Sequence, residues 1–264
     1  MKTINPSELS PMQVQMILQT AVAPRPIALA STIDKNGNVN LSPFSFFNLF
    51  SSNPPILIFS PARRVRDHST KDTLHNVLEV PEVVIGNVNF DMVQQVSLSS
   101  TEYETGVDEF IKSGLTKKPS ELVKPPLIAE SPVNFECKVI EVKPLGNEGG
   151  AGNLVICEVL KIHIREEFLN EEGNLDQKKL DLVSRLGGNW YGRTSAETLF
   201  EVPKPLVTKG IGFDQLPSEI RNSKIFTGND LGMLANVEQL PEGNFTADEN
   251  LHLEAQKLLL EGKI

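Results

Sequence analysis

Small hydroxyl side chains and aromatic side chains are interleaved in two stretches of the N-terminal third of the chain. The polar and aromatic residues that stand out there are Ser31, Thr32, Ser42, Pro43, Phe44 and Ser45. This mixture suits a flat, amphipathic ring ligand, because apolar faces sandwich the ring while hydroxyl or backbone groups meet its polar edge. The same pattern is also typical of a plain hairpin whose phenylalanines fill a core, and the pattern alone leaves both interpretations open.

A third stretch combines positive charge with hydroxyl groups around the expected start of a helix. Its candidate binding residues are Ser60, Arg63, Lys71, Asp72 and Thr73. A phosphate group favours such a place, because free N–H groups at a helix N-terminus attract anions and nearby cations add charge-assisted hydrogen bonds. The alternative is a solvated basic loop followed by an ordinary helix cap.

The histidines do not form a metal-binding pattern. His68, His75, His163 and His252 lack an Asp, Glu or Cys partner at the spacing of metal ligands. The chain also lacks a G-x-S-x-G elbow, a Walker A loop and a G-x-G-x-x-G fingerprint. We therefore expect no metal centre and find no support for a hydrolase, a nucleoside triphosphatase or a Rossmann dehydrogenase.

A helix is expected ahead of the first polar stretch. Ser10, Pro11 and Gln13 form a helix start with a capping box. The apolar residues that follow recur at helical spacing, at Val14, Ile17, Leu18 and Ala21. We expect this helix to pack its apolar stripe on the core and to end at Pro24.

Strands outnumber helices in the rest of the pattern. We expect strands at residues 27–33, 39–48, 56–60 and 83–88, and a long antiparallel pair at 133–144 and 154–165. Helices are expected from about Ser69, with Leu74, Val77 and Leu78 as the apolar face, and at residues 91–98 and 107–112. Because tight turns join most strands, the pattern favours a mainly β fold, an antiparallel, Greek-key-like barrel with peripheral helices, over a doubly wound sheet.

We expect two parts in the chain. Residues 1–202 carry the barrel pattern, and residues 203–264 form a C-terminal extension with little periodicity. Thr246 and Glu249 form a capping box for a terminal helix that we expect to pack on the barrel or on a partner subunit.

Composition excludes several classes of partner. The 264 residues carry 25 Lys and Arg against 34 Asp and Glu, a net charge of −9, which argues against binding nucleic acid or an anionic membrane. The two cysteines, Cys137 and Cys157, are too few for a disulfide framework. No apolar run approaches the roughly 20 residues of a membrane span, and the N-terminus does not resemble a secretory signal. We expect a soluble, cytoplasmic protein.

Several motifs, taken together and in order, resemble the flavin reductase-like family with the FMN-binding split barrel. They are residues 23–32, Asn40–Asn48, Asn53-Pro54-Pro55, Lys71-Asp72-Thr73, Tyr103–Phe110, Lys124-Pro125-Pro126, Ala129–Val133 and Arg185–Tyr191. Each motif alone is weak, but the ordered set is specific and covers residues 21–193, about two thirds of the chain.

The resemblance implies a six-stranded antiparallel split barrel that forms a homodimer and binds FMN near the dimer interface. Ser31 and Thr32 would edge the isoalloxazine, with Thr32 near N5, and the residues from Ser42 to Ser45 would line the ring. The ribityl phosphate would be held by Ser60, Arg63, Lys71, Asp72 and Thr73, with Asp72 capping the helix or orienting Lys71. Trp190, within Arg185–Tyr191, is the candidate contribution of the second subunit.

The implied activity is transfer of hydride or electrons between NAD(P)H and FMN, which requires stacked rings rather than a protein acid or base. In one place the chain departs from the family. Several reductases carry a Gly-x-His ahead of a strand, where the His contacts the nicotinamide, and here Asn153 stands at that position. An alternative is therefore a flavoredoxin-type electron-transfer protein that is reduced by a redox protein partner. A flavin-binding protein without turnover is a further alternative.

Overall fold

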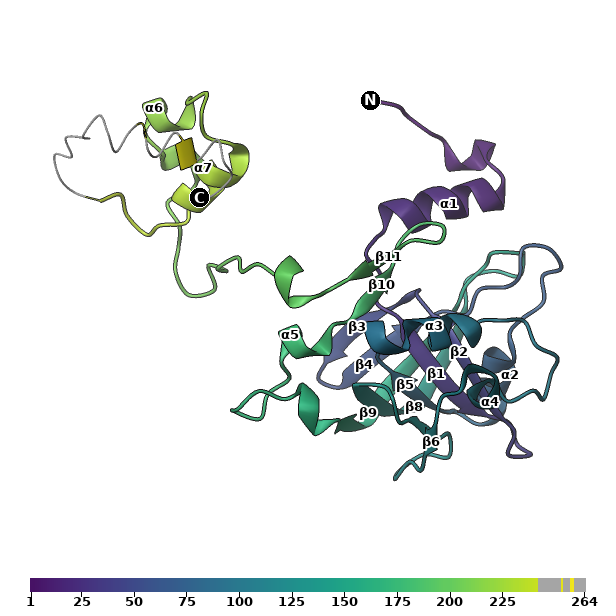
Figure 1. The fold of residues 1–264 in the computed structure, drawn as a ribbon. Coiled ribbons are helices and arrows are strands. Elements are labelled where there is room, and N and C mark those ends of the chain that lie inside the picture. The colour runs from purple at the N-terminus through teal and green to yellow at the C-terminus, as the bar shows by residue number, and fades with distance from the viewer. Residues whose placement is uncertain (242–252, 254–256, 259–264) are drawn as a thin grey trace. The chain divides into compact units, whose positions relative to one another are not determined.

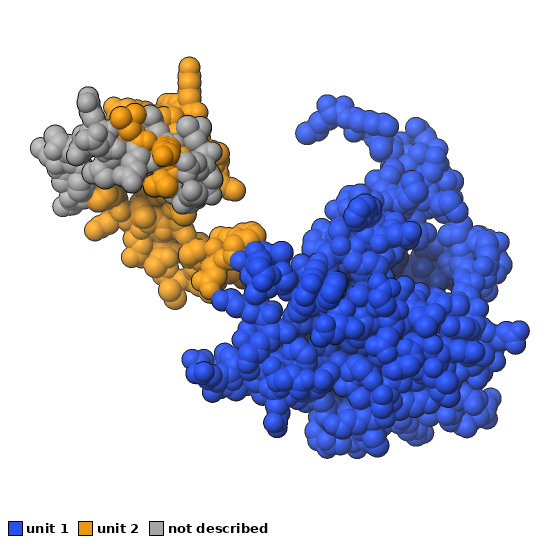
Figure 2. Space-filling view, viewed as in Figure 1, with its two compact units in different colours: residues 1–199 blue, residues 200–264 orange. Residues whose placement is uncertain are grey.

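The computed structural model describes residues 1–241, 253, 257 and 258. The chain divides into two compact units, residues 1–199 and residues 200–264 (Figure 2). Each unit is described by itself below. Among the described residues, no helix has the length and apolar character needed to cross a membrane.

Unit 1 is built around one antiparallel sheet of seven strands (Figure 1). The strands are β1 (Ala28–Ile33), β2 (Val39–Phe44), β3 (Phe47–Ser52), β4 (Pro55–Phe59), β5 (Glu82–Gly86), β8 (Val133–Pro144) and β9 (Asn153–Ile164). Their order is β2-β1-β5-β8-β9-β4-β3, and every neighbouring pair is antiparallel. The expected antiparallel barrel with peripheral helices is confirmed.

The two edges of this sheet are consecutive in the chain. Six antiparallel steps separate β2 from β3, so the two strands run in the same direction, and only Ser45 and Phe46 lie between them. They are the two halves of one bent strand, which makes the barrel six-stranded and leaves it split at the bend. The single strand expected at residues 39–48 is therefore wrong in one respect, since its halves pair with β1 and with β4.

The barrel has an inner and an outer apolar layer. Ala28 and Ala30 of β1 face an inner cluster, whereas Leu29 packs in an outer cluster with Met92 and Phe110. This alternation follows from the two-residue period of a strand whose two faces are both covered. Successive side chains of β1 therefore pack alternately in the inner and the outer cluster.

Short helices cover the barrel. In unit 1 they are α1 (Pro11–Ala21), α2 (Asp72–Glu79), α3 (Val93–Leu98), α4 (Glu109–Ser113) and α5 (Gln177–Leu180), with 3₁₀ turns at Pro6–Glu8, Phe90–Met92, Glu166–Phe168 and Ala196–Thr198. The remaining strands are β6 (Lys117–Lys118), β7 (Leu127–Ile128), β10 (Val183–Arg185) and β11 (Tyr191–Arg193). Leu74 and Val77 of α2 are buried in the inner cluster as expected, but Leu78 is exposed, because only one side of this short helix meets the barrel.

The expectation that α1 packs on the core is wrong. Its capping box between Ser10 and Gln13 is confirmed, yet the helix has no buried residue. Figure 1 shows α1 standing off the barrel beside the loop between β10 and β11. Met16 is 64% exposed and Leu18 is 54% exposed, so the apolar stripe is real but is not covered within unit 1.

Unit 2 has a small apolar cluster of its own. Its described helices are α6 (Ser218–Arg221) and α7 (Gly228–Leu234), with a 3₁₀ turn at Phe213–Gln215. Leu216, Leu231 and Ala235 are buried together. Thr227 and Asp230 form a capping box at the start of α7. The terminal helix expected from Thr246 lies outside the described residues.

Candidate functional site

The bend between β2 and β3 brings together the end of one strand and the start of a loop. The backbone N–H of Ser60, which follows β4, donates to the carbonyl of Phe46 at 2.8 Å. The rings of Phe44 and Phe59 pack with their centroids 5.2 Å apart. The bend is thus fixed by one backbone hydrogen bond and one aromatic contact, and Ser60 lies beside Phe46.

Lys71 reaches into this corner without a carboxylate partner. Its ammonium donates to the Ser42 hydroxyl at 3.1 Å and lies 5.1 Å from the centre of the Phe44 ring. Burial, and then the nearby charge of Arg64, lower the pKa of Lys71. In the part of the chain that the structure describes, Lys71 forms no ion pair. A partly desolvated ammonium that lacks an anion is a favourable place for an anionic ligand.

Of two neighbouring arginines, Arg64 has a carboxylate partner and Arg63 has none among the described residues. Arg64 is compensated, since it pairs with Glu102 at 3.0 Å and donates to the Ser69 hydroxyl and the Thr70 carbonyl. Arg63 donates to the carbonyl of His68 at 3.2 Å, and its Nε is buried without a hydrogen-bond partner. Arg63 and Lys71, unlike Arg64, therefore form no ion pair among the described residues, although the charges of Glu102 and Glu109 act on Lys71 from farther away.

The start of α2 adds backbone donors beside Lys71. Lys71 is the N-cap of the helix, and no side chain caps its first turn. Asp72 lies in that first turn but does not bond the free N–H groups. Thr73 is fully buried and its hydroxyl accepts a hydrogen bond from Asn40 at 3.0 Å, so its side chain serves to join α2 to β2.

Ser31 and Thr32 do not line one surface. Both are 0% exposed, and because they are adjacent in β1 their side chains lie on opposite faces. The Thr32 hydroxyl accepts a hydrogen bond from Asn76 of α2 at 3.1 Å. The Ser31 hydroxyl has no hydrogen-bond partner among the residues that the structure describes. The structure therefore separates these two residues from each other, while it brings Ser42, Phe44 and Lys71 together and places Ser60 at the same bend.

Asn153 has a structural role that its position in the sequence did not reveal. It is 3% exposed, and both its side-chain amide and its backbone N–H donate to the carbonyl of Pro61, at 2.9 and 3.2 Å. The preceding residue, Gly152, lies so close to Ser60 that a Cβ there would be 2.6 Å from the Ser60 hydroxyl. The loop before β9 is thus clamped onto the segment that carries Ser60 and Arg63.

Trp190 lies on a projecting hairpin that Arg25 ties to α1. Arg25 is buried and donates to the carbonyls of Gln19, Val22 and Leu186. Trp190 itself is 75% exposed. Sequence reasoning missed Arg25, although a charged residue between Pro24 and Pro26 at the start of a buried strand was a signal for it.

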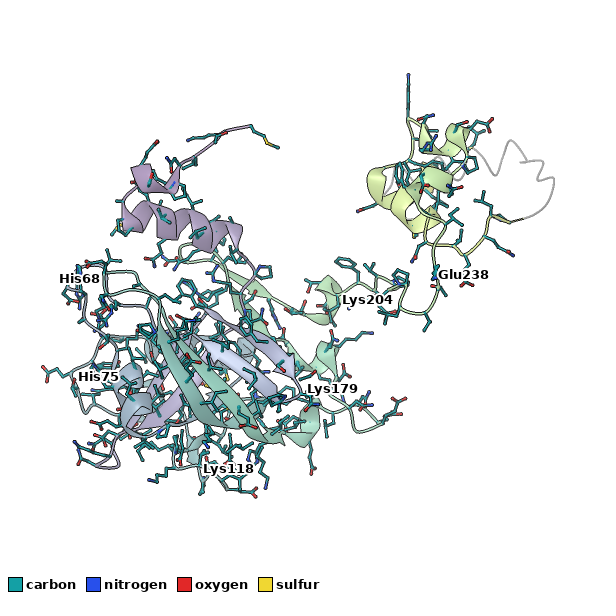
Figure 3. The ribbon with its side chains drawn as sticks, turned by 180° about the vertical axis from the view of Figure 1, so that it is seen from behind. His68, His75, Lys118, Lys179, Lys204 and Glu238 are labelled. Carbon is teal, nitrogen blue, oxygen red and sulfur yellow. The ribbon has the colours of Figure 1, made fainter. Side chains whose placement is uncertain are left out.

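His68 and His75 lie at separate exposed positions (Figure 3), and His163 is partly buried. His68 lies 3.2 Å from Glu148, His75 lies 2.7 Å from the Thr70 hydroxyl, and His163 lies 2.6 Å from Glu136. Among the residues that the structure describes, no three His, Cys, Asp or Glu side chains are grouped as metal ligands.

The chain is similar to known proteins over most of unit 1. Residues 21–181 match the flavin reductase like domain. An uncharacterized protein of Halalkalibacterium halodurans is 38% identical over 208 residues, which cover 78% of this chain and 98% of that protein. A protein of Aquifex aeolicus is 36% identical over 181 residues, covering 69% of this chain and 90% of that protein.

Solved structures have the same fold. Nitrilotriacetate monooxygenase component B from Bacillus cereus superposes with a TM-score of 0.70 at 28% identity, covering 77% of this chain and 98% of that chain. The 2-nitrobenzoate 2-nitroreductase of Pseudomonas fluorescens gives a TM-score of 0.68 at 27% identity, covering 79% and 100%. Flavoredoxin of Desulfovibrio vulgaris, at 21% identity and a TM-score of 0.57 over 70% of this chain and 92% of that chain, shares the fold. With its bent edge strand, its split barrel and this domain match, the chain belongs to the flavin reductase-like family of flavin-binding split-barrel proteins.

Proposed function

We propose that this protein is an FMN-binding oxidoreductase that transfers hydride or electrons between NAD(P)H and FMN. The observation that carries the proposal is Lys71, which has no ion pair among the described residues and stands at the uncapped start of α2, in contact with Ser42 and Phe44 ahead of the bend. Arg63 is a second cation of the preceding loop without an ion pair among those residues. Membership of the flavin reductase-like family supports it, as do the names of the two similar structures, a monooxygenase component and a nitroreductase.

The described residues fit a ligand with one phosphate and one flat ring. Lys71, Arg63 and the N–H groups at the start of α2 offer positive charge and donors to a phosphate. Ser60, whose backbone N–H donates to Phe46 at the bend, is a further candidate donor. The segment from Ser42 to Ser45 offers backbone groups to the polar edge of the ring. In this proposal Thr32 and Thr73 act through their contacts with Asn76 and Asn40, which join α2 to β1 and β2.

Bound FMN would supply the redox chemistry, and the residues of the chain would supply binding and orientation. Lys71 and Arg63 would offset the charge of the phosphate in a partly desolvated corner. Pro43 would exclude water from one side of the ring, while Phe44, on the opposite face of β2, is buried in the inner cluster beneath Lys71. Backbone donors near the bend would stabilise negative charge on the pyrimidine edge of the reduced ring.

A substitution at Lys71 tests the phosphate contact. Lys71→Ala should weaken FMN binding by about 1.5–3 kcal/mol, the contribution of a hydrogen bond to a charged group. The matched control is Lys118→Ala, which removes an exposed lysine of β6 (Figure 3). Fluorescence titration with FMN measures both. An unchanged affinity in Lys71→Ala would show that the phosphate binds elsewhere.

A second candidate function is flavoredoxin-type electron transfer, in which a redox protein rather than NAD(P)H reduces the flavin. The burial of Asn153 favours it, because a side chain held by Pro61 does not reach a nicotinamide. Anaerobic reduction of the FMN-loaded protein by NADH and by NADPH separates the two. Rapid bleaching by either nucleotide supports the first candidate, and bleaching by dithionite but by neither nucleotide supports the second.

We also propose that the protein acts as a homodimer. An isolated helix of fewer than about 12–15 residues is marginally stable in water, and α1 has neither a buried residue nor a charged one. A second set of exposed apolar side chains lies on the edge strand β3, at Leu49 and Phe50. A second copy of the chain would cover both surfaces at once through a two-fold contact. Trp190 would then be available to the flavin of the partner.

A further inference from the structure

The outer edge of β2 is closed by a buried carboxylate. Because β2 lies at one end of the sheet order, its outward backbone groups have no strand partner. Glu109, the first residue of α4, is 9% exposed, and its Oε2 accepts the backbone N–H of Leu41 at 2.9 Å. The family resemblance gave no role to this residue, and the proposed flavin site does not use it.

The backbone N–H groups of β2 point alternately toward β1 and away from it, which shows which outward N–H groups remain after the contact with Glu109. Since the N–H of Leu41 points away from β1, the N–H groups of Asn40, Ser42 and Phe44 point toward it. Pro43, the next outward residue, has no N–H to offer. The next outward donor after Leu41 is therefore the N–H of Ser45, at the bend.

Side chains of opposite charge contact β2 at neighbouring residues. Lys71, at the start of α2, contacts the Ser42 hydroxyl and the ring of Phe44. Glu109, from α4, holds the backbone one residue earlier. Burial raises the pKa of Glu109, and the hydrogen bond from Leu41 opposes that rise. Burying a carboxylate costs free energy unless it is hydrogen-bonded, and the N–H of Leu41 supplies one such bond to Glu109. This pairing is what we expect of a buried group that fixes a neighbouring segment.

We propose that Glu109 is a positioning residue for the flavin site: by holding the Leu41 N–H it sets the backbone of Ser42 to Ser45, and through that backbone the affinity and the reduction potential of the bound flavin. This inference rests on the proposed function, because it assigns the Ser42–Ser45 backbone to the flavin ring. Glu109 acts through β2 and does not touch the ligand.

The hold on β2 is tested in the flavin-free protein by amide hydrogen exchange at Leu41, followed by NMR. Glu109→Ala should speed this exchange at least about tenfold, because the N–H loses its acceptor. Glu109→Gln should keep most of the protection, since the amide oxygen still accepts, and it provides a readout if the alanine variant does not fold. The control is Glu130→Gln, which alters another carboxylate that accepts a backbone N–H, that of Thr116. Equal Leu41 exchange in the wild type and both Glu109 variants would overturn the proposal.

The coupling to the flavin is tested by FMN titration and by the midpoint potential of the bound flavin. Glu109→Ala should raise the Kd for FMN about tenfold and shift the potential, Glu109→Gln should restore the Kd to within about threefold, and Glu130→Gln should change neither. Normal FMN affinity and potential in Glu109→Ala, with faster Leu41 exchange, would overturn the coupling alone. Failure of the wild type to bind any flavin would overturn the proposed function and the coupling together, while the exchange result would still decide the hold on β2.

Discussion

Glu136 is the clearest example of a single residue that organises a loop. It is fully buried and accepts the backbone N–H groups of Glu121, Leu122 and Val123, and His163 lies 2.6 Å away. Burial by itself raises the pKa of this carboxyl, but the four contacts together hold it below its usual range. A carboxyl whose pKa is lowered by folding stabilises the fold above its unfolded pKa, and this contribution is lost as the pH falls through the folded value.

Replacing Glu136 should therefore give a pH-dependent loss of stability. Glu136→Gln should lower the free energy of unfolding by about 3 kcal/mol at pH 7, because three partly buried N–H groups lose a charged acceptor. The difference from the wild type should begin to shrink as the pH falls below about 4.3, the ordinary pKa of a glutamate, and should disappear only below the lowered folded pKa, where the wild-type carboxyl is protonated too. Urea unfolding at several pH values measures it, with Glu141→Gln, an exposed position on the same strand, as control. A difference that stays constant with pH would contradict this account.

Asn153 gives a second prediction at the scale of a residue. Asn153→Ala removes one of the two hydrogen bonds to the Pro61 carbonyl, which should cost about 1 kcal/mol of stability. Because the same contact holds the segment with Ser60 and Arg63, FMN affinity should fall as well. Thermal unfolding and FMN titration, with the exposed Asn147→Ala as control, measure both effects. A lower stability with unchanged FMN affinity would show that the hydrogen bond between Asn153 and Pro61 does not position the binding site.

At the scale of elements, the sequence predicts strands and helices that have local signals, but it does not predict which distant element each of them packs against. The strand pair expected at residues 133–144 and 154–165 was predictable, with the second strand displaced by one residue, because a two-residue period and a glycine-rich turn are local signals. The division of residues 39–48 at Ser45 was not, since the choice of β1 or β4 as partner depends on the closure of the barrel. Similarly, the pattern of α1 shows an apolar stripe but not what covers it. Ser42 and Lys71 were named from the sequence as candidates for different parts of the ligand, and only the structure shows that they are in contact. Glu109 acts through a backbone group that no side-chain pattern reveals.

The exposed stripe of α1 provides the prediction at this scale. Met16→Glu should weaken the proposed dimer about tenfold or more, since burying a methionine contributes about 1.5–3 kcal/mol and the variant places a charge there. Gln15→Glu adds the same charge to an exposed polar position of the helix and serves as control. Sedimentation at several concentrations gives the dissociation constants. A wild-type monomer, or equal constants for the two variants, would contradict a role of α1 in assembly.

The whole molecule combines a flavin reductase-like barrel with a second unit that the domain match does not include. We propose that the unpaired positive charges of Arg63 and Lys71 bind the phosphate of FMN at the split in the barrel. The most direct test compares FMN with riboflavin, which lacks the phosphate, by fluorescence titration of the flavin-free full chain. The wild type should prefer FMN by about 10- to 100-fold, the equivalent of one or two charge-assisted hydrogen bonds, and Lys71→Ala should lose most of that preference. Equal affinities of the wild type for FMN and riboflavin would contradict the claim.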